Sequence, residues 1–305
     1  MSGLTGRAAA APRGTLKLWL LASRPRTLPA AVAPVLVGTA LAATEDEFSV
    51  LPFLAALVGS VFIQIGTNLS NDYSDARRGA DTDDRLGPVR VTAGGLMPPK
   101  RVLVGTYVAF GIAVAAGLYL AAVAGWELLV VGAASILAGV LYTGGPRPYG
   151  YEGLGELFVF VFFGLVAVTG SYWVQTEELR WEAFALAVPV GLLAAAILVV
   201  NNIRDIDTDR RAGKRTLAVK LGRDRARLLF TAMVIVAFAV PAAVWAFGGL
   251  SAWLLLTLAA LPLAPPLIET VSSRTDGPAL NGALAATGRL LAVYSLLLSA
   301  AVLLS

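Results

Sequence analysis

Two acidic clusters, each at the end of a strongly apolar segment, are the residues of this chain best suited to chemistry. The polar side chains of the first cluster are Asn68, Asp72 and Asp75. Those of the second cluster are Asn201, Asp205 and Asp209. Spacings of one or two helical turns place the side chains of each cluster on one helical face. Such oxygen ligands suit Mg²⁺ or Mn²⁺, and Mg²⁺ usually combines one or two carboxylates with a substrate phosphate. Two stripes that face one cavity therefore predict a metal site for a diphosphate.

Basic residues follow each cluster directly in the sequence. After the first cluster come Arg77, Arg78, Arg85 and Arg90, and after the second come Arg210, Arg211, Lys214, Arg215 and Lys220. Arg binds phosphate through two parallel hydrogen bonds and Lys binds it as a point charge, so these residues would make diphosphate a better leaving group. The alternative is that both clusters are ordinary solvated loops of a membrane protein. Their duplication at equivalent helix ends favours the functional interpretation.

Two further groups of residues have open alternatives. A turn rich in Gly and Pro between the clusters contains Arg147, Tyr149 and Tyr151. These side chains would line a cavity mouth and bind phosphate or an aromatic acceptor, or they would form an interfacial aromatic belt. Arg24 and Arg26 precede the first apolar run. They would bind an anionic substrate, or they would only set the membrane topology.

The composition is that of an integral membrane protein. Of 305 residues, 57% are hydrophobic and 14% are charged, whereas a soluble domain has about 25% charged residues. The chain has no His and no Cys, which excludes disulfides, His or Cys metal sites, thiol nucleophiles and a His general base. It also lacks the Gly-x-x-x-x-Gly-Lys-Ser/Thr pattern of a phosphate-binding loop, which disfavours ATP hydrolysis.

Nine apolar runs approach the length needed to cross a bilayer. They cover about 29–43, 50–69, 102–123, 127–142, 154–174, 183–200, 228–247, 252–271 and 290–305. The first and last runs are short, and we expect both to extend into their flanking sequence. With the N-terminus inside, 23 of the 24 Lys and Arg residues fall on the cytoplasmic side and only Arg180 falls outside, a strong positive-inside pattern. The sequence predicts an all-α membrane protein, a bundle of nine transmembrane helices around a central cavity that opens to the cytoplasm. Residues 1–14 are expected to form a disordered cytoplasmic tail, and residues 15–305 a single transmembrane domain.

Four segments carry a resemblance to a known family. They are QIGTNLSNDYSDARRGADTDD at 64–84, GPVRVTAGGLM at 87–97, LYTGG at 141–145 and NNIRDIDTDRRAGKRTLAVKLG at 201–222. With the nine runs, they resemble the UbiA superfamily of intramembrane aromatic prenyltransferases over nearly the whole chain. Within it they are most similar to the branch that prenylates 1,4-dihydroxy-2-naphthoate. The common first motif has a third Asp where this chain has Gly79. Asp81 would replace that ligand or order the loop.

The resemblance implies a mechanism and a set of site residues. Mg²⁺ held by Asn68, Asp72, Asp205 and Asp209 would bind a polyprenyl diphosphate, and Lys214 with Arg77 or Arg215 would assist departure of the diphosphate. The naphthoate ring would attack the allylic cation and lose its carboxylate as CO₂, while the prenyl tail lies in a groove open to lipid. The expected catalytic residues are Asp72, Asp205 and Lys214, and the expected metal ligands are Asn68, Asp72, Asp75, Asp205 and Asp209. The expected substrate-binding residues are Arg24, Arg77, Asp81, Arg147, Tyr149, Asn201, Lys214 and Arg215. The partners implied are these two substrates and the bilayer of a bacterial plasma membrane, with no nucleic acid.

Two alternatives to this function remain open. The first keeps the superfamily and changes the acceptor; 4-hydroxybenzoate is the main rival, followed by homogentisate, a haem precursor or a phosphoribosyl donor. The second is a secondary transporter whose intramembrane carboxylates relay cations. The centres of the apolar runs carry almost no charge, which disfavours transport.

Overall fold

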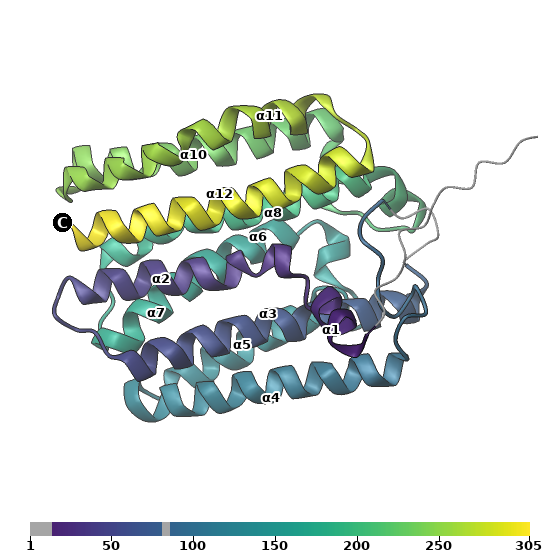
Figure 1. Ribbon diagram of the computed structural model, residues 1–305, viewed down its shortest axis with the longest axis horizontal. Coiled ribbons are helices and arrows are strands. Elements are labelled where there is room, and N and C mark those ends of the chain that lie inside the picture. The colour runs from purple at the N-terminus through teal and green to yellow at the C-terminus, as the bar shows by residue number, and fades with distance from the viewer. Residues whose placement is uncertain (1–13, 81–85) are drawn as a thin grey trace, which may run out of the picture.

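A computed structural model describes residues 14–80 and 86–305 of the chain, and all its regular elements in these ranges are helices (Figure 1). Asp81 and nearly all of the predicted N-terminal tail lie outside the described residues. The long helices run roughly parallel to one another, with short connections at one end of the bundle (Figure 1). At the other end lie the short helix α1 and the segments that follow the two acidic clusters.

The helices follow the predicted apolar runs closely. In the first half they are α1 Thr15–Ser23, η1 Pro25–Thr27, α2 Pro29–Ala43, α3 Val50–Arg78, α4 Pro99–Ala124, α5 Glu127–Leu141 and η2 Tyr149–Glu152. The middle of the chain forms α6 Gly155–Val159, η3 Phe160–Val166, α7 Ala167–Thr176, α8 Trp181–Arg211 and α9 Leu217–Leu221. The last helices are α10 Arg223–Gly248, η4 Ala252–Leu263, α11 Ala264–Ser273 and α12 Gly277–Leu303.

In the part of the chain that the structure describes, seven helical segments are long and apolar enough to cross a membrane. The pair formed by Thr15–Thr27 and α2, bent by 56°, would make an eighth span. The remaining apolar run forms α5, which is shorter. The prediction of an all-helical, multi-pass membrane protein is therefore confirmed, whereas the count of nine transmembrane helices stays a prediction.

The three longest of the described helices extend well beyond the length that a membrane crossing requires. α3 has 29 residues, α8 has 31 and α12 has 27, whereas a span needs about 20. The acidic clusters occupy the last turns of α3 and α8 and are therefore held by helical backbone. The last predicted run, 290–305, is the C-terminal part of α12, which begins at Gly277. These extensions place the polar side chains on rigid elements at one end of the bundle.

α8 is the central helix of the bundle, and most residues of its apolar stretch are buried. It packs against α2, α10, α12 and the π-helical segment η3. A Cβ added to Gly164 in η3 would lie 2.6 Å from the Cα atom of Gly191 in α8, so glycine is required where these two backbones meet. π-helical turns are rare and frequent at functional sites. The segment η3 forms one wall of the cavity described below.

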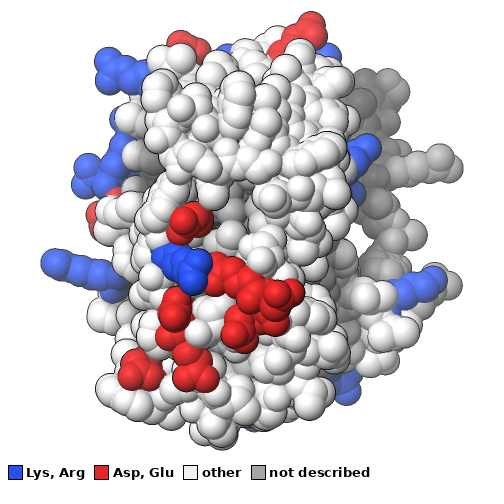
Figure 2. Space-filling view, turned by 90° about the vertical axis from the view of Figure 1, so that its left-hand side faces the viewer, with Lys and Arg blue, Asp and Glu red and all other residues white. Residues whose placement is uncertain are grey.

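The end of the bundle opposite the two acidic clusters also carries many carboxylates. Figure 2 looks onto this end and shows carboxylates gathered around one basic side chain. Arg180 pairs there with Glu45 at 3.0 Å and with Glu178 at 3.4 Å. The end of the molecule that carries Arg180 is therefore rich in carboxylates.

Candidate active site

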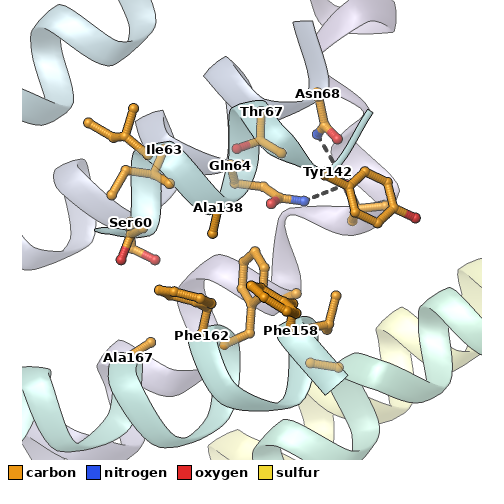
Figure 3. A pocket seen from close by; sticks show the side chains of 18 of the residues that line it. Ser60, Ile63, Gln64, Thr67, Asn68, Ala138, Tyr142, Phe158, Phe162 and Ala167 are labelled. Carbon is orange, nitrogen blue, oxygen red and sulfur yellow. Dashed lines mark hydrogen bonds between the residues drawn. The ribbon is translucent and has the colours of Figure 1, made fainter. Parts of the chain in front are cut away.

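The site lies in a cavity of about 500 Å³ that is polar at one end and apolar at the other. Its walls come from α3, α4, α5, the segment from η2 to α7, and α8. Figure 3 shows Gln64, Thr67 and Asn68 of α3 on one side and Phe158 and Phe162 on the other. The polar end is formed by the last turns of α3 and α8, where both acidic clusters face the same space.

The polar side chains of the first acidic cluster do not all face the cavity. Asn68, Asn71 and Asp75 line the cavity, whereas Asp72 does not. The two carboxylate oxygens of Asp72 accept hydrogen bonds from the backbone N–H groups of Val91 and Thr92, both at 3.1 Å. Asp72 thus fastens the segment after the first cluster to α3. Its predicted role as a metal ligand stays a prediction.

Asn71 is a cavity residue that sequence reasoning missed. It is buried, and its Oδ1 accepts a hydrogen bond from the hydroxyl of Thr143 at 2.9 Å. Asn71 and Asp75 are four residues apart on α3, as Asn201 and Asp205 are on α8. This match between the two clusters is the sequence signal that would have identified Asn71.

Asp75 is the centre of a charged cluster that joins separate parts of the chain. Its Oδ1 accepts a hydrogen bond of 2.6 Å from the hydroxyl of Tyr151. Its Oδ2 lies 3.7 Å from Arg90 and 3.8 Å from Lys214. The ammonium of Lys214 also lies 4.9 Å from the centre of the Tyr151 ring. Because Lys214 follows the second cluster, Asp75 connects the two predicted halves of the site.

The second cluster lies as predicted on the cavity face of α8. Asn201, Asp205 and Asp209 all line the cavity, together with Asn202. Both oxygens of Asp205 accept hydrogen bonds from the guanidinium of the adjacent Arg204, at 2.8 and 2.5 Å. A buried bidentate pair of this kind fixes the orientation of the carboxylate.

The predicted basic residues fall into two groups. Arg24 and Lys214 line the cavity, and Arg90 lines it as well. Arg24 has a left-handed backbone with φ 53° at the break between α1 and η1, a conformation that is uncommon outside glycine. In contrast, Arg77, Arg147 and Arg215 are exposed and are not cavity residues. Arg77 donates instead to the hydroxyl of Tyr73 at 3.2 Å.

An aromatic row leads from the polar end of the cavity into its apolar part. Tyr142 meets Tyr149 edge to face at 5.5 Å between ring centres. Tyr149 stacks on Phe158 at 4.0 Å, and Phe158 is nearly parallel to Phe162 at 6.1 Å. Burial raises the pKa of Tyr149 well above its ordinary value, so its phenol stays neutral. The predicted substrate-binding residue Tyr149 is therefore a cavity residue, and Tyr142 is a further one.

Glu156 is a buried carboxyl group that the motifs did not indicate. It begins the wall helix α6, and its Oε1 accepts a hydrogen bond of 2.8 Å from the amide of Asn202. Its Oε2 is buried and has no hydrogen-bond partner among the residues that the structure describes. Glu156 thereby orients a side chain that faces the cavity.

The donor set of the cavity fits a hard divalent cation. α3 and α8 direct Asp75, Asp205, Asp209 and amide oxygens into one space, and oxygen ligands are those that Mg²⁺ prefers. Within residues 14–80 and 86–305, no three carboxylates lie close enough to enclose a metal ion by themselves. Mg²⁺ usually takes only one or two carboxylates and completes its shell with water and phosphate.

The fold and the cavity together define a multi-pass membrane protein with a cavity that is charged at one end and apolar at the other. The family model of the UbiA prenyltransferase family matches residues 31–279, and the chain belongs to this family. The 1,4-dihydroxy-2-naphthoate octaprenyltransferase of Mycobacterium tuberculosis is 42% identical over 283 residues, which cover 93% of this chain and 96% of that protein. The Escherichia coli protein of the same description is 40% identical over 272 residues, 86% of this chain and 87% of its own length.

Solved structures show the same fold at lower sequence identity. A UbiA homolog from Archaeoglobus fulgidus, bound to GPP and Mg²⁺, aligns with a TM-score of 0.66 at 18% identity and covers 94% of this chain and 100% of that one. A UbiA homolog from Aeropyrum pernix K1 aligns with a TM-score of 0.65 at 18% identity and covers 90% of this chain and 96% of that one. The predicted family is confirmed, and so is an all-helical, UbiA-like membrane fold; the count of nine spans and the opening of the cavity to the cytoplasm stay predictions. The family assignment favours the enzyme over the transporter hypothesis.

Proposed function

We propose that this protein transfers a polyprenyl group from polyprenyl diphosphate to 1,4-dihydroxy-2-naphthoate, with loss of CO₂, to give the demethylmenaquinol of menaquinone biosynthesis. The observation that carries the proposal is the cavity itself. Its polar end combines carboxylates with Lys214 and Arg90, and its other end is aromatic and apolar. The identity of about 40% to naphthoate octaprenyltransferases over most of the chain supports the choice of acceptor.

The residues at the polar end fit a magnesium diphosphate. We propose that Asn68, Asp75, Asp205 and Asp209 hold Mg²⁺ together with the diphosphate, each ion taking only one or two of these carboxylates, with Asn71 and Asn201 beside them. Bound Mg²⁺ would supply electrostatic stabilisation of the charge that develops on the departing diphosphate. Lys214 and Arg90 would bind the same anion directly, because both cations already face an anionic group, Asp75, at the cavity wall. Mn²⁺ has similar ligand preferences and is the expected substitute.

The aromatic row would accommodate the reacting carbons. Phe158 and Phe162 line the cavity beyond the polar end, and aromatic faces attract a neighbouring cation. In the reaction, the bond between the allylic carbon and the diphosphate oxygen breaks, and the diphosphate retains the electron pair. A ring carbon of the naphthoate forms the new C–C bond. Loss of CO₂ from that carbon restores the aromatic ring, so no base has to remove a ring proton, which is consistent with a chain without His.

The topology and location are part of the same proposal. The nine apolar runs are proposed to cross the bacterial plasma membrane, with the N-terminus and the polar end of the cavity in the cytoplasm. The positive-inside distribution of Lys and Arg in the sequence supports this orientation, since it would put 23 of the 24 basic residues of the sequence on that side and Arg180 on the other. Residues 15–305 would form one domain, preceded by a disordered tail.

The direct test is prenyl transfer by the purified protein in detergent. The reaction would contain a long-chain polyprenyl diphosphate and Mg²⁺, with 1,4-dihydroxy-2-naphthoate and 4-hydroxybenzoate offered as competing acceptors and EDTA as the control. The proposal predicts Mg²⁺-dependent prenylation of the naphthoate with release of one CO₂ per product. Preference for 4-hydroxybenzoate would overturn the acceptor but keep the enzyme class. Turnover that persists in EDTA would overturn the metal site.

A further inference from the structure

The guanidinium of Arg204 lies outside the cavity and donates hydrogen bonds to two residues of the cavity wall. Arg204 is one of the largest fully buried side chains of the protein and does not line the cavity. It donates to both oxygens of Asp205 and, at 2.8 Å, to Oδ1 of Asn201. Both acceptors face the cavity. The orientation of these two oxygen-bearing groups therefore depends on the position of one side chain.

Asn281 of α12 is the anchor of that side chain. Its Oδ1 accepts a hydrogen bond of 2.7 Å from the remaining terminal nitrogen of Arg204. Its amide nitrogen donates to the backbone oxygen of Leu86 at 2.9 Å. Because the amide must donate to a carbonyl, the Oδ1 atom has to point toward the guanidinium. Asn281 itself is not a cavity residue.

These two hydrogen bonds connect the two halves of the site through the C-terminal helix. Leu86 opens the segment that Asp72 fastens to α3 through Val91 and Thr92. On the other side, the chain of bonds reaches Asp205 through Arg204. A single amide on α12 thus contacts both the segment after the first cluster and the support of the second cluster.

We propose that Asn281 is a positioning residue for the magnesium diphosphate site, acting through Arg204. This inference rests on the proposed function. Without Asn281, a buried N–H group of Arg204 loses its acceptor, which is unfavourable. Arg204 would then turn toward another acceptor and release Asp205 and Asn201 from their present orientation. Substitution of the groups that support metal ligands typically lowers metal affinity or activity by about 10- to 100-fold.

The test compares Asn281→Leu with Thr287→Val on the same helix. Leu has nearly the size of Asn but cannot form either hydrogen bond. Thr287 is fully buried, and its hydroxyl donates only to the backbone oxygen of Ala283 in its own helix, so this control removes a buried polar group without touching Arg204. Binding of inorganic diphosphate in the presence of Mg²⁺ is measured by calorimetry, and prenyl transfer is measured as a function of Mg²⁺ and of each substrate.

Asn281→Leu is expected to weaken binding of magnesium diphosphate and to raise the Mg²⁺ concentration for half-maximal activity, each by about 10-fold or more. The KM for the aromatic acceptor should stay within about twofold of wild type, because the two hydrogen bonds of Asn281 lead to Arg204 and Leu86 and not to the aromatic row. Thr287→Val should leave both the binding of magnesium diphosphate and the Mg²⁺ concentration for half-maximal activity unchanged. Arg204→Lys combined with Asn281→Leu should bind magnesium diphosphate no more weakly than Arg204→Lys alone, since both substitutions remove the same support.

Wild-type binding of magnesium diphosphate by Asn281→Leu would overturn the inference. So would a loss of binding in Thr287→Val as large as that in Asn281→Leu, or a loss in the double variant equal to the sum of the losses in Arg204→Lys and Asn281→Leu. The calorimetric measurement needs no acceptor. A wild-type protein that binds magnesium diphosphate but does not prenylate the naphthoate would contradict the proposed function alone.

Discussion

Asp75 offers the sharpest test of the site, because one carboxylate there faces two cations from different parts of the chain. Its Oδ2 lies 3.7 Å from Arg90 and 3.8 Å from Lys214, and all three side chains are nearly buried. At an effective dielectric constant of about 20, each pair contributes a gross Coulomb energy of about 4 kcal/mol. Desolvation offsets much of this energy, and removal of one member of a buried ion pair typically costs about 3–5 kcal/mol.

Asp75→Asn is the perturbation to make, because it removes the charge and keeps an oxygen that accepts the Tyr151 hydrogen bond. If about 3 kcal/mol of this interaction also supports the transition state, kcat/KM for the polyprenyl diphosphate falls by about 100-fold. Loss of one oxygen ligand should also raise the Mg²⁺ concentration for half-maximal activity. Initial rates over a range of Mg²⁺ and prenyl diphosphate concentrations measure both effects, and thermal unfolding measures the loss of stability.

Asp207→Asn is the matched control. Asp207 lies between Asp205 and Asp209 in the second motif, but its side chain is 62% exposed and pairs with Arg223 at 3.0 Å. It is not a cavity residue. Exposed ion pairs contribute little, so this variant should retain wild-type kinetics. Equal kinetics for Asp75→Asn and Asp207→Asn would refute the assignment of the charged cluster to the active site.

Three further substitutions test other parts of the structure. Asp72→Ala should increase hydrogen exchange of the Val91 and Thr92 amides, because they lose their buried acceptor; unchanged exchange would contradict the fastening role. Gly164→Val should destabilise the protein by about 1–3 kcal/mol or more in thermal or denaturant unfolding, because a Cβ there would lie 2.6 Å from the backbone of α8, and wild-type stability would show that the two helices can separate. Asp276, the N-cap of α12, has its pKa lowered by the Ala279 amide and then by Arg274. The stability it contributes is present above the ordinary Asp pKa of about 3.9 and is lost as the pH falls through the lower folded value, so Asp276→Asn should show a smaller loss of thermal stability on acidification than wild type.

The sequence by itself determined the helices, their polarity and the family. Apolar runs and helical spacing act locally, so they placed most helix ends within a few residues and put the two clusters on helix ends. The exceptions were the C-terminal ends of α3 and α8, which continue well past their apolar runs, and the start of α12, where the expected extension of the last run into its flanking sequence is several turns long. The segments around both clusters were also sufficient to indicate the family, because they combine polar residues at fixed helical spacing with an otherwise apolar chain.

Tertiary structure alone decided which side of each helix meets the cavity. Asn71 and Asp72 are adjacent in α3 and therefore point about 100° apart, and only the packing of the neighbouring segment turned Asp72 toward Val91 and Thr92. Arg90 was one of several similar basic residues until the fold brought it to Asp75. The contact of Arg204 with Asn281 joins residues 77 positions apart, and no local spacing encodes such a meeting. The motifs fixed which chemical groups were available, and the packing of distant helices fixed which of them share one site.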